Sequence, residues 1–109
     1  MDIGGSVMVK AGYVATKTVT GALRKGERET ITLDLDGPIF QIAGSCDNGC
    51  DDLDFRLLDS DGRLVEEDVE GDDAPIVTAE TAKGKYTLQI IMVACEDRCA
   101  YVARVFKMP

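Results

Sequence analysis

The stretch Tyr86-Thr87-Leu88-Gln89-Ile90-Ile91-Met92-Val93 decides the fold of this chain, because its side chains alternate as they do along a β-strand. Every second residue from Tyr86 to Met92 is large and apolar, which places one face of the strand against a core. The same alternation recurs in residues 30–35 and 53–57. Helical periodicity is weak throughout, so the pattern indicates a protein built from strands.

Turn signals separate these runs at intervals of about ten residues, which is typical of a β-sandwich or barrel. The signals are Arg24-Lys25-Gly26, Asp36-Gly37-Pro38, Asp59-Ser60-Asp61-Gly62, Gly71-Asp72-Asp73 and Lys83-Gly84-Lys85. We therefore predict an all-β fold, a jelly-roll-like antiparallel β-sandwich of about eight or nine strands. The predicted strands are residues 6–14, 16–22, 28–35, 38–44, 53–59, 62–67, 74–80, 85–94 and 99–107.

The length of 109 residues leaves room for one domain, residues 1–109. Apolar residues make up 45% of the chain, too many for a disordered segment. Residues 1–25 differ from the rest, because they are rich in Gly, Val, Thr and Ala. We interpret them as an edge strand or as an exchange arm that completes the sheet of a neighbouring copy.

The net charge of −8 excludes some partners. It repels phosphate backbones, and the Lys and Arg residues are scattered along the chain, so we expect no nucleic-acid partner. No apolar run approaches the roughly 20 residues that a membrane helix requires, so we expect no transmembrane segment. The same charge suits cation binding or a basic partner surface.

Four cysteines occur in two copies of one spacing, Cys46-Asp47-Asn48-Gly49-Cys50 and Cys95-Glu96-Asp97-Arg98-Cys99. Three arrangements are open. The cysteines of each pair bond to each other, the two pairs cross-link, or all four thiolates hold zinc. We favour the local disulfides, because acidic residues in both triplets would oppose a cluster of thiolates. A five-residue ring then stabilises the fold by about 2 kcal/mol.

Disulfides persist in oxidising compartments, so we expect an extracytoplasmic protein, secreted, periplasmic or at the cell surface. The first residues, Met1-Asp2-Ile3-Gly4-Gly5, lack the basic and apolar regions of an export signal. Either the sequence starts at the mature or recombinant protein, or the cysteines stay reduced in a cytosol. We favour the first, because paired cysteines flanked by acidic turn residues are typical of an oxidised framework.

Acidic residues surround both cysteine loops. If residues 53–59 and 85–94 pair as antiparallel neighbours, the loops meet at one end of the sandwich. Their carboxylates could then supply oxygen ligands to Ca²⁺, which takes six to eight. The candidate ligands are Asp47, Asp51, Asp52, Asp54, Glu96 and Asp97. The competing interpretation, which we favour, is that these are solvated turn residues.

The composition argues against an enzyme. The chain has no His, so neither Ser45 nor Cys46 has an obvious activating base. It has no Trp to form a sugar platform, and no Gly-rich phosphate loop precedes a helix. We expect no catalytic residues and no certain cofactor, with Ca²⁺ as the one candidate.

From about Glu29 to Phe106 the order of features resembles the bacterial pre-peptidase C-terminal domain family. The matching motifs are Asp51-x-Leu53-Asp54-Phe55-x-Leu57-Leu58-Asp59, Asp61-Gly62, Asp72-Asp73-Ala74-Pro75-Ile76, Gly84-x-Tyr86-Thr87-Leu88-x-Ile90, and a closing strand from Tyr101. The resemblance implies a jelly-roll β-sandwich that is non-catalytic and works outside the cytoplasm. Such a module binds a polymer or partner, or aids secretion and folding, sometimes with calcium. Both cysteine loops and the missing peptidase depart from the family pattern.

Two functions follow from these observations. The first is a non-catalytic extracytoplasmic binding or accessory module of the pre-peptidase C-terminal type. The alternative is a self-assembling structural subunit of an extracellular filament or surface layer, in which the N-terminal arm exchanges strands between copies. The second predicts a homo-oligomer or filament.

Overall fold

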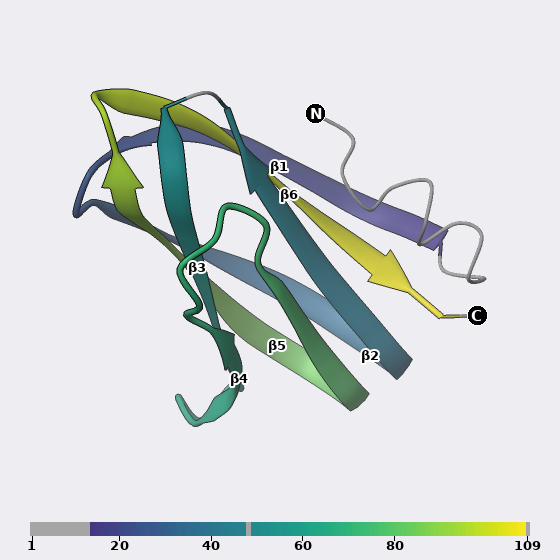
Figure 1. Ribbon diagram of the computed structural model, residues 1–109. Coiled ribbons are helices and arrows are strands. Elements are labelled where there is room, and N and C mark those ends of the chain that lie inside the picture. Colours follow the sequence, from purple (N-terminus) through teal and green to yellow (C-terminus); the bar gives the residue numbers. More distant parts are fainter. Residues whose placement is uncertain (1–13, 48, 109) are drawn as a thin grey trace.

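Every regular element in the described part of the chain is a β-strand. The computed structural model describes residues 14–47 and 49–108. Its strands are β1 (Val14–Arg24), β2 (Arg28–Cys46), β3 (Cys50–Leu58), β4 (Leu64–Asp68), β5 (Ile76–Cys95) and β6 (Arg98–Lys107). They form one antiparallel sheet in the order β1-β6-β2-β5-β3-β4 (Figure 1). The predicted all-β class is confirmed.

Strands β2 and β5, of 19 and 20 residues, set the architecture. They pair from Arg28↔Ile91 to Ala43↔Ile76, and at opposite ends they meet different neighbours. Strand β6 pairs with residues 40–46 of β2, whereas β3 pairs with residues 87–95 of β5. One half of the β2–β5 pair is extended by β6 and the other half by β3, and the sheet folds over into two layers (Figure 1).

The number of strands predicted from the sequence is wrong, since the described residues form six. The predicted strands 28–35 and 38–44 are one continuous strand, β2, and the predicted strands 74–80 and 85–94 are both part of β5. The predicted strand 6–14 lies outside the described residues except for its last one. The predictions at 16–22, 53–59, 62–67 and 99–107 correspond to β1, β3, β4 and β6.

The error has a physical cause at the corner between the layers. Pro38 lacks an N–H, and the β2–β5 register passes from Gly37↔Ala82 to Ile39↔Glu80 without it. Across from it, Thr81 has a positive φ of 51°. These residues bend a paired strand instead of ending it, so the turn signal at residues 36–38 marks a corner.

The core lies between the two layers and is centred on β3. Leu53, Phe55 and Leu57 alternate along this strand and are fully buried. Gly44 of β2 lies directly against Phe55, because a Cβ placed there would be 2.4 Å from the ring Cζ. A residue without a side chain is therefore required at position 44 for the two layers to approach this closely.

The segment between β4 and β5, residues 69–75, links the layers across the open side of β3. The Leu53 N–H donates to the Asp72 carbonyl at 2.9 Å, and the Gly44 N–H donates to the Pro75 carbonyl at 2.8 Å. The segment thus bonds to both β3 and β2. It carries acidic residues directly beside the outer side of β3.

Candidate binding face

The structure forms the local disulfides. Cys46 bonds to Cys50 with their Cα atoms 6.0 Å apart, and Cys95 bonds to Cys99 with their Cα atoms 6.2 Å apart. No cysteine in the described residues is free. The cross-linked and zinc-bound arrangements are therefore not the ones observed. Each bridge closes the connection between two consecutive strands, β2 to β3 and β5 to β6.

The two cysteine loops lie side by side, as expected if β3 and β5 are neighbours. Cys50 pairs with Cys95 in the β3–β5 register. Backbone hydrogen bonds join the loops: the Asp47 N–H donates to the Ala100 carbonyl at 3.1 Å, and the Glu96 N–H donates to the Gly49 carbonyl at 2.9 Å. Gly49 has a φ of 95°, which a glycine adopts without strain. The loops form one rigid pole, which we call the disulfide pole.

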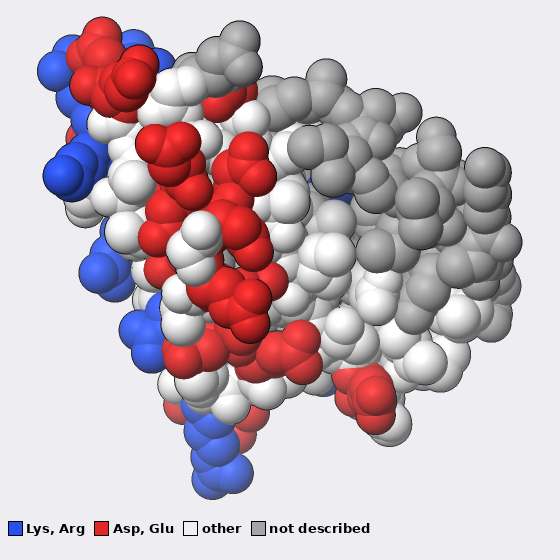
Figure 2. Space-filling view, viewed as in Figure 1, with Lys and Arg blue, Asp and Glu red and all other residues white. Residues whose placement is uncertain are grey.

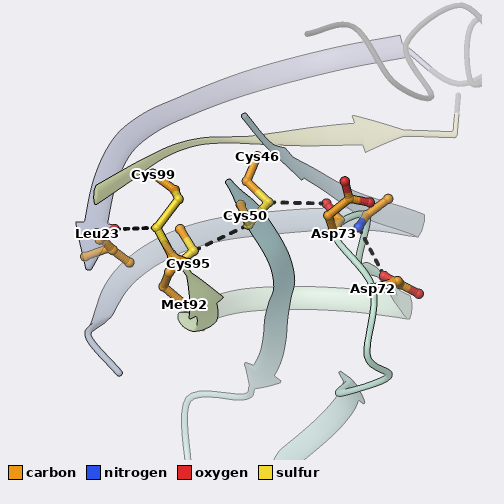
Figure 3. The surroundings of a disulfide bond; sticks show 9 residues. Leu23, Cys46, Cys50, Asp72, Asp73, Met92, Cys95 and Cys99 are labelled. Carbon is orange, nitrogen blue, oxygen red and sulfur yellow. Dashed lines mark hydrogen bonds between the residues drawn. A yellow bond between two sulfur atoms is a disulfide. The ribbon is translucent and has the colours of Figure 1, made fainter. Parts of the chain in front are cut away.

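The sulfur atoms of the disulfide pole also close one end of the core. Cys46, Cys50 and Cys99 are buried and belong to the main hydrophobic cluster. Figure 3 shows the Cys50 sulfur pointing at Met92, with the two sulfurs 3.5 Å apart. The sequence analysis did not predict that these cysteines are buried. The signal available was the apolar strand that precedes each pair.

The Cys46 bridge also touches the segment that links the layers. The Cys46 sulfur lies 3.7 Å from the Asp73 carbonyl oxygen, as Figure 3 shows. In the same view, the Ala74 N–H donates to the Asp72 carboxylate at 3.0 Å. The acidic segment is thus anchored beside the pole at its C-terminal end.

The six predicted calcium ligands occupy different environments. Asp47, Asp51, Glu96 and Asp97 are exposed, Asp52 is half-buried, and Asp54 is buried. Within residues 14–47 and 49–108, no three carboxylate or thiol groups converge as ligands of a formed metal centre. Calcium binding by the full set of six stays a prediction.

Asp52 and Asp54 form a pair of carboxyl groups on β3. Burial is the main cause that raises the pKa of Asp54 from 3.8 to about 6, followed by its hydrogen bond with Asp52 and by the charges of Asp52, Asp68 and Asp72. Asp54 is only 9% exposed. Its Oδ1 and the Oδ1 of Asp52 are buried and accept no hydrogen bond from the described residues.

The acidic residues of β4 and the following segment mostly hold the backbone in place. The Asp68 carboxylate accepts from the Ile76 N–H at 2.9 Å, and the Glu66 carboxylate accepts from the Thr78 N–H at 2.8 Å. The N–H groups of Ile76 and Thr78 lie on a part of β5 that β3 does not pair with, and these carboxylates accept them where a neighbouring strand would otherwise do so. Because β5 contributes only backbone N–H groups to these bonds, no residue type in β5 could have predicted them.

Negative charge is concentrated on one face. Of the 20 acidic residues of the chain, 11 lie between residues 51 and 73, together with only two of the 12 basic residues. Figure 2 shows a continuous band of Asp and Glu side chains down this side of the molecule, with Lys and Arg at its margins. Arg56 pairs with Glu67 at 3.1 Å and offsets one charge. We call residues 66–73 together with Asp51, Asp52 and Asp54 the acidic face.

Exposed apolar side chains lie within and beside the acidic face. Leu64 and Val65 of β4 are 47% and 41% exposed, and Val69 is 50% exposed. A face that combines negative charge with apolar side chains can attract a cationic partner and also bury apolar area with it. No helix formed by the described residues is long and apolar enough to cross a membrane.

Comparisons with known proteins identify the architecture but no family. No protein-family model matches the sequence, and no curated protein does. Among solved structures, the chain is similar to the pre-peptidase C-terminal domain of a collagenase from Bacillus anthracis. The TM-score is 0.65 at 15% identity, over 82% of this chain and 87% of that one.

Two other solved structures share the fold. A periplasmic inhibitor of g-type lysozyme from Aeromonas hydrophila, PliG, matches with a TM-score of 0.57 at 10% identity, over 89% of this chain and 90% of that one. A Bacillus endospore appendage from a family of disulfide-linked pili matches with a TM-score of 0.51 at 13% identity, over 88% and 89%. At these identities the likeness shows a shared β-sandwich fold alone.

Proposed function

We propose that this protein is a non-catalytic, extracytoplasmic binding module, and that its acidic face binds a cationic macromolecule. The observation that carries the proposal is the concentration of 11 acidic residues between residues 51 and 73. Nine of these eleven residues belong to the acidic face, and Figure 2 shows a continuous band of Asp and Glu side chains on one side of the β-sandwich. A fixed patch of one charge sign attracts a partner of the opposite sign and speeds their encounter.

Two bridges support the extracytoplasmic part of the proposal, since disulfides persist in oxidising compartments. The fold also occurs in a periplasmic inhibitor and in an endospore appendage. Intact mass of exported protein, measured with and without reductant, tests this part. Four free thiols in exported material would contradict it.

The binding test uses poly-L-lysine as a defined cationic probe. A variant with Glu67→Gln, Glu70→Gln and Asp73→Asn removes three exposed charges from the acidic face. The matched control has Asp34→Asn, Asp36→Asn and Glu80→Gln, three exposed acids on the β2–β5 pair. Both variants have the same net charge, so a difference between them reports the position of the charges.

We expect the acidic-face variant to bind poly-L-lysine at least about tenfold more weakly than the control variant, with a smaller dependence on salt. Surface plasmon resonance at two salt concentrations measures both quantities. Equal losses in the two variants would mean that only net charge matters. The acidic face would then not be a binding site.

A second candidate function is supported by the edge of the sheet. Among the described strands, β1 lies at the end of the sheet and pairs with β6 alone, which is the position where a further strand can add. The fold shared with the pilus subunit is compatible with assembly. We propose as the alternative a structural subunit of a filament or surface layer, in which residues 1–13 of one copy add to β1 of the next.

Assembly is tested by negative-stain imaging and size-exclusion chromatography of the full chain beside a chain that lacks residues 1–13. Filaments or oligomers that disappear on truncation would support the alternative. Monomers in both samples at high concentration would exclude it and leave the binding module.

A further inference from the structure

We propose that the cationic partner binds as an extended peptide segment, which adds to the outer edge of β4 as a further strand. This inference rests on the proposed function and names how the partner is held. Among the described strands, β4 lies at the end of the sheet and pairs with β3 alone (Figure 1). The edge of β4 that faces away from β3 is therefore a place where another strand can add through backbone hydrogen bonds.

The hydrogen bonds of β3 show which backbone groups of β4 point to this outer edge. The Leu53 N–H donates to the Asp72 carbonyl at 2.9 Å, so the backbone groups of Leu53 point away from β5 and toward the β4 side. Backbone groups alternate in direction along a strand, so those of Phe55 point the same way, toward Asp68 opposite. Glu67 precedes Asp68, and its N–H and carbonyl therefore point to the outer edge.

The charge of β4 selects the kind of strand that can add. Residues 64–70, Leu-Val-Glu-Glu-Asp-Val-Glu, contain four acids and no basic residue. Arg56 of β3 pairs with Glu67 and offsets one of these charges. Opposite charges across two strands stabilise the pair, and like charges destabilise it. A second copy of β4 would place acids against acids, whereas a segment rich in Lys or Arg has the complementary charge.

The apolar side chains of this region add a second requirement. Leu64, Val65 and Val69 are all exposed. A strand made only of Lys would leave them in water, whereas a strand with apolar residues opposite Val65 and Val69 buries them. The partner segment therefore carries Lys or Arg opposite the acids and apolar side chains at its two ends.

The other end of the sheet does not suit the same partner. Strand β1 also pairs with one described neighbour, β6, but β1 contains Lys17 and Arg24 and no acid. Like charges would oppose a cationic strand there. The two ends of the sheet thus differ in the sign of their charge, and the peptide should add at β4 and leave β1 unchanged.

A peptide that complements residues 64–70 in the antiparallel direction, acetyl-Lys-Val-Lys-Lys-Lys-Val-Val-amide, tests this inference on the full chain. Its fourth residue lies opposite Glu67. Two modified versions carry backbone N-methyl groups, on the second, fourth and sixth residues or on the third, fifth and seventh. The first set removes the N–H groups that would face β4, and the other set removes N–H groups that would face solvent. All versions have the same side chains and charge.

We expect calorimetry to show that the first methylated peptide binds at least about tenfold more weakly than the unmodified one, because each lost backbone hydrogen bond lowers affinity by about two- to tenfold. The other methylated peptide should bind nearly as well as the unmodified one. In hydrogen exchange followed by NMR, the unmodified peptide should slow exchange of the Glu67 amide. The Asp68 amide, which faces β3, and the amides of β1 should not change.

A matched pair of variants tests the position of the charge. Glu67→Lys and Glu80→Lys change the net charge equally, and both residues are exposed. The first should weaken binding of the unmodified peptide about fivefold more than the second, because only position 67 lies opposite a Lys of the peptide. Equal binding of the two methylated peptides, or unchanged exchange at Glu67, would overturn strand addition even where poly-L-lysine still prefers the acidic face. Loss of that preference would instead overturn the proposed function.

Discussion

The disulfide pole and the segment of residues 66–76 border the same strand, β3, and are held in place by different physics. The pole is fixed by covalent bonds, by backbone hydrogen bonds between its loops and by buried sulfur atoms. The segment is fixed by backbone hydrogen bonds to β2 and β3 and, in addition, by carboxylates that accept backbone N–H groups. The bridges of the pole do not titrate, whereas part of what holds the segment is titratable carboxylate.

This difference separates a framework from an adjustable surface. The apolar face of β3 belongs to the framework, and its outer side, with Asp52 and Asp54, faces the acidic segment. One strand therefore carries the core on one side and charge on the other. Substitutions on the two sides should therefore change the free energy of unfolding by different amounts, with different pH dependence and even with opposite sign.

The largest effect is expected in the framework. Phe55→Ala removes a fully buried ring that packs against Gly44, and should lower the free energy of unfolding by about 3 to 5 kcal/mol. Arg56→Ala, one residue away on the outer side, should cost less than about 1 kcal/mol, because its ion pair is exposed. Guanidinium denaturation measures both values. Similar losses would mean that the two sides of β3 are not distinct.

The sequence predicted this framework well. Alternation in residues 53–57 and 86–92 identified the buried faces, and the spacing of the cysteines predicted local bridges. The prediction of strand ends failed at the corner. Gly37 and Pro38 were interpreted as a turn between two strands, but they lie within one long strand, whose pairing with β5 continues on both sides of them. Local patterns cannot distinguish a strand that ends from one that bends.

The acidic surface was less predictable. The sequence located its charges, but Asp54 was grouped with exposed loop acids, and only the tertiary structure brings Asp68 and Asp72 near it. Likewise, the bonds from Glu66 and Asp68 to β5 depend on how the layers close. Contacts between a side chain and a distant backbone leave no periodic trace in the sequence.

The next effect concerns the pole. Replacing both cysteines of one bridge with alanine, in Cys46→Ala/Cys50→Ala or in Cys95→Ala/Cys99→Ala, should cost about 2 kcal/mol for a ring of this size. The loss should be nearly independent of pH, because no titratable group is removed from the oxidised protein. Chemical denaturation at two pH values checks it. A strong pH dependence would indicate that the bridges act through the acidic segment.

Asp54→Asn should have the opposite sign. In the folded protein the pKa of Asp54 is raised from 3.8 to about 6, chiefly by burial. Below its ordinary pKa both folded and unfolded states hold the proton, and no penalty exists. As pH rises through this window the unfolded state ionises first, so wild-type stability falls, and the penalty is complete above the folded pKa.

At neutral pH a rise of about two pKa units corresponds to roughly 3 kcal/mol. The buried Asn amide offsets about 1 to 2 kcal/mol of this, so the Asn variant should be more stable than wild type by about 1 to 2 kcal/mol. The difference should shrink as pH falls and reverse in sign at acidic pH, where only the cost of the amide remains. Thermal unfolding across this range, with Asp97→Asn as an exposed control, measures it. A stability gain that persists unchanged at acidic pH would show that ionisation of Asp54 is not its source.

The smallest effect is expected where a carboxylate holds the edge of β5. Glu66→Ala removes the acceptor of the Thr78 N–H and should cost about 0.5 to 1 kcal/mol, whereas Glu66→Gln keeps an acceptor oxygen and should cost less. Hydrogen exchange at the Thr78 amide should accelerate in the Ala variant alone. Glu67→Ala, which removes only an exposed ion pair, should leave that amide unchanged. If all three variants exchange alike, the edge is held by the backbone register itself, and the contrast between a covalent pole and a carboxylate-held segment disappears.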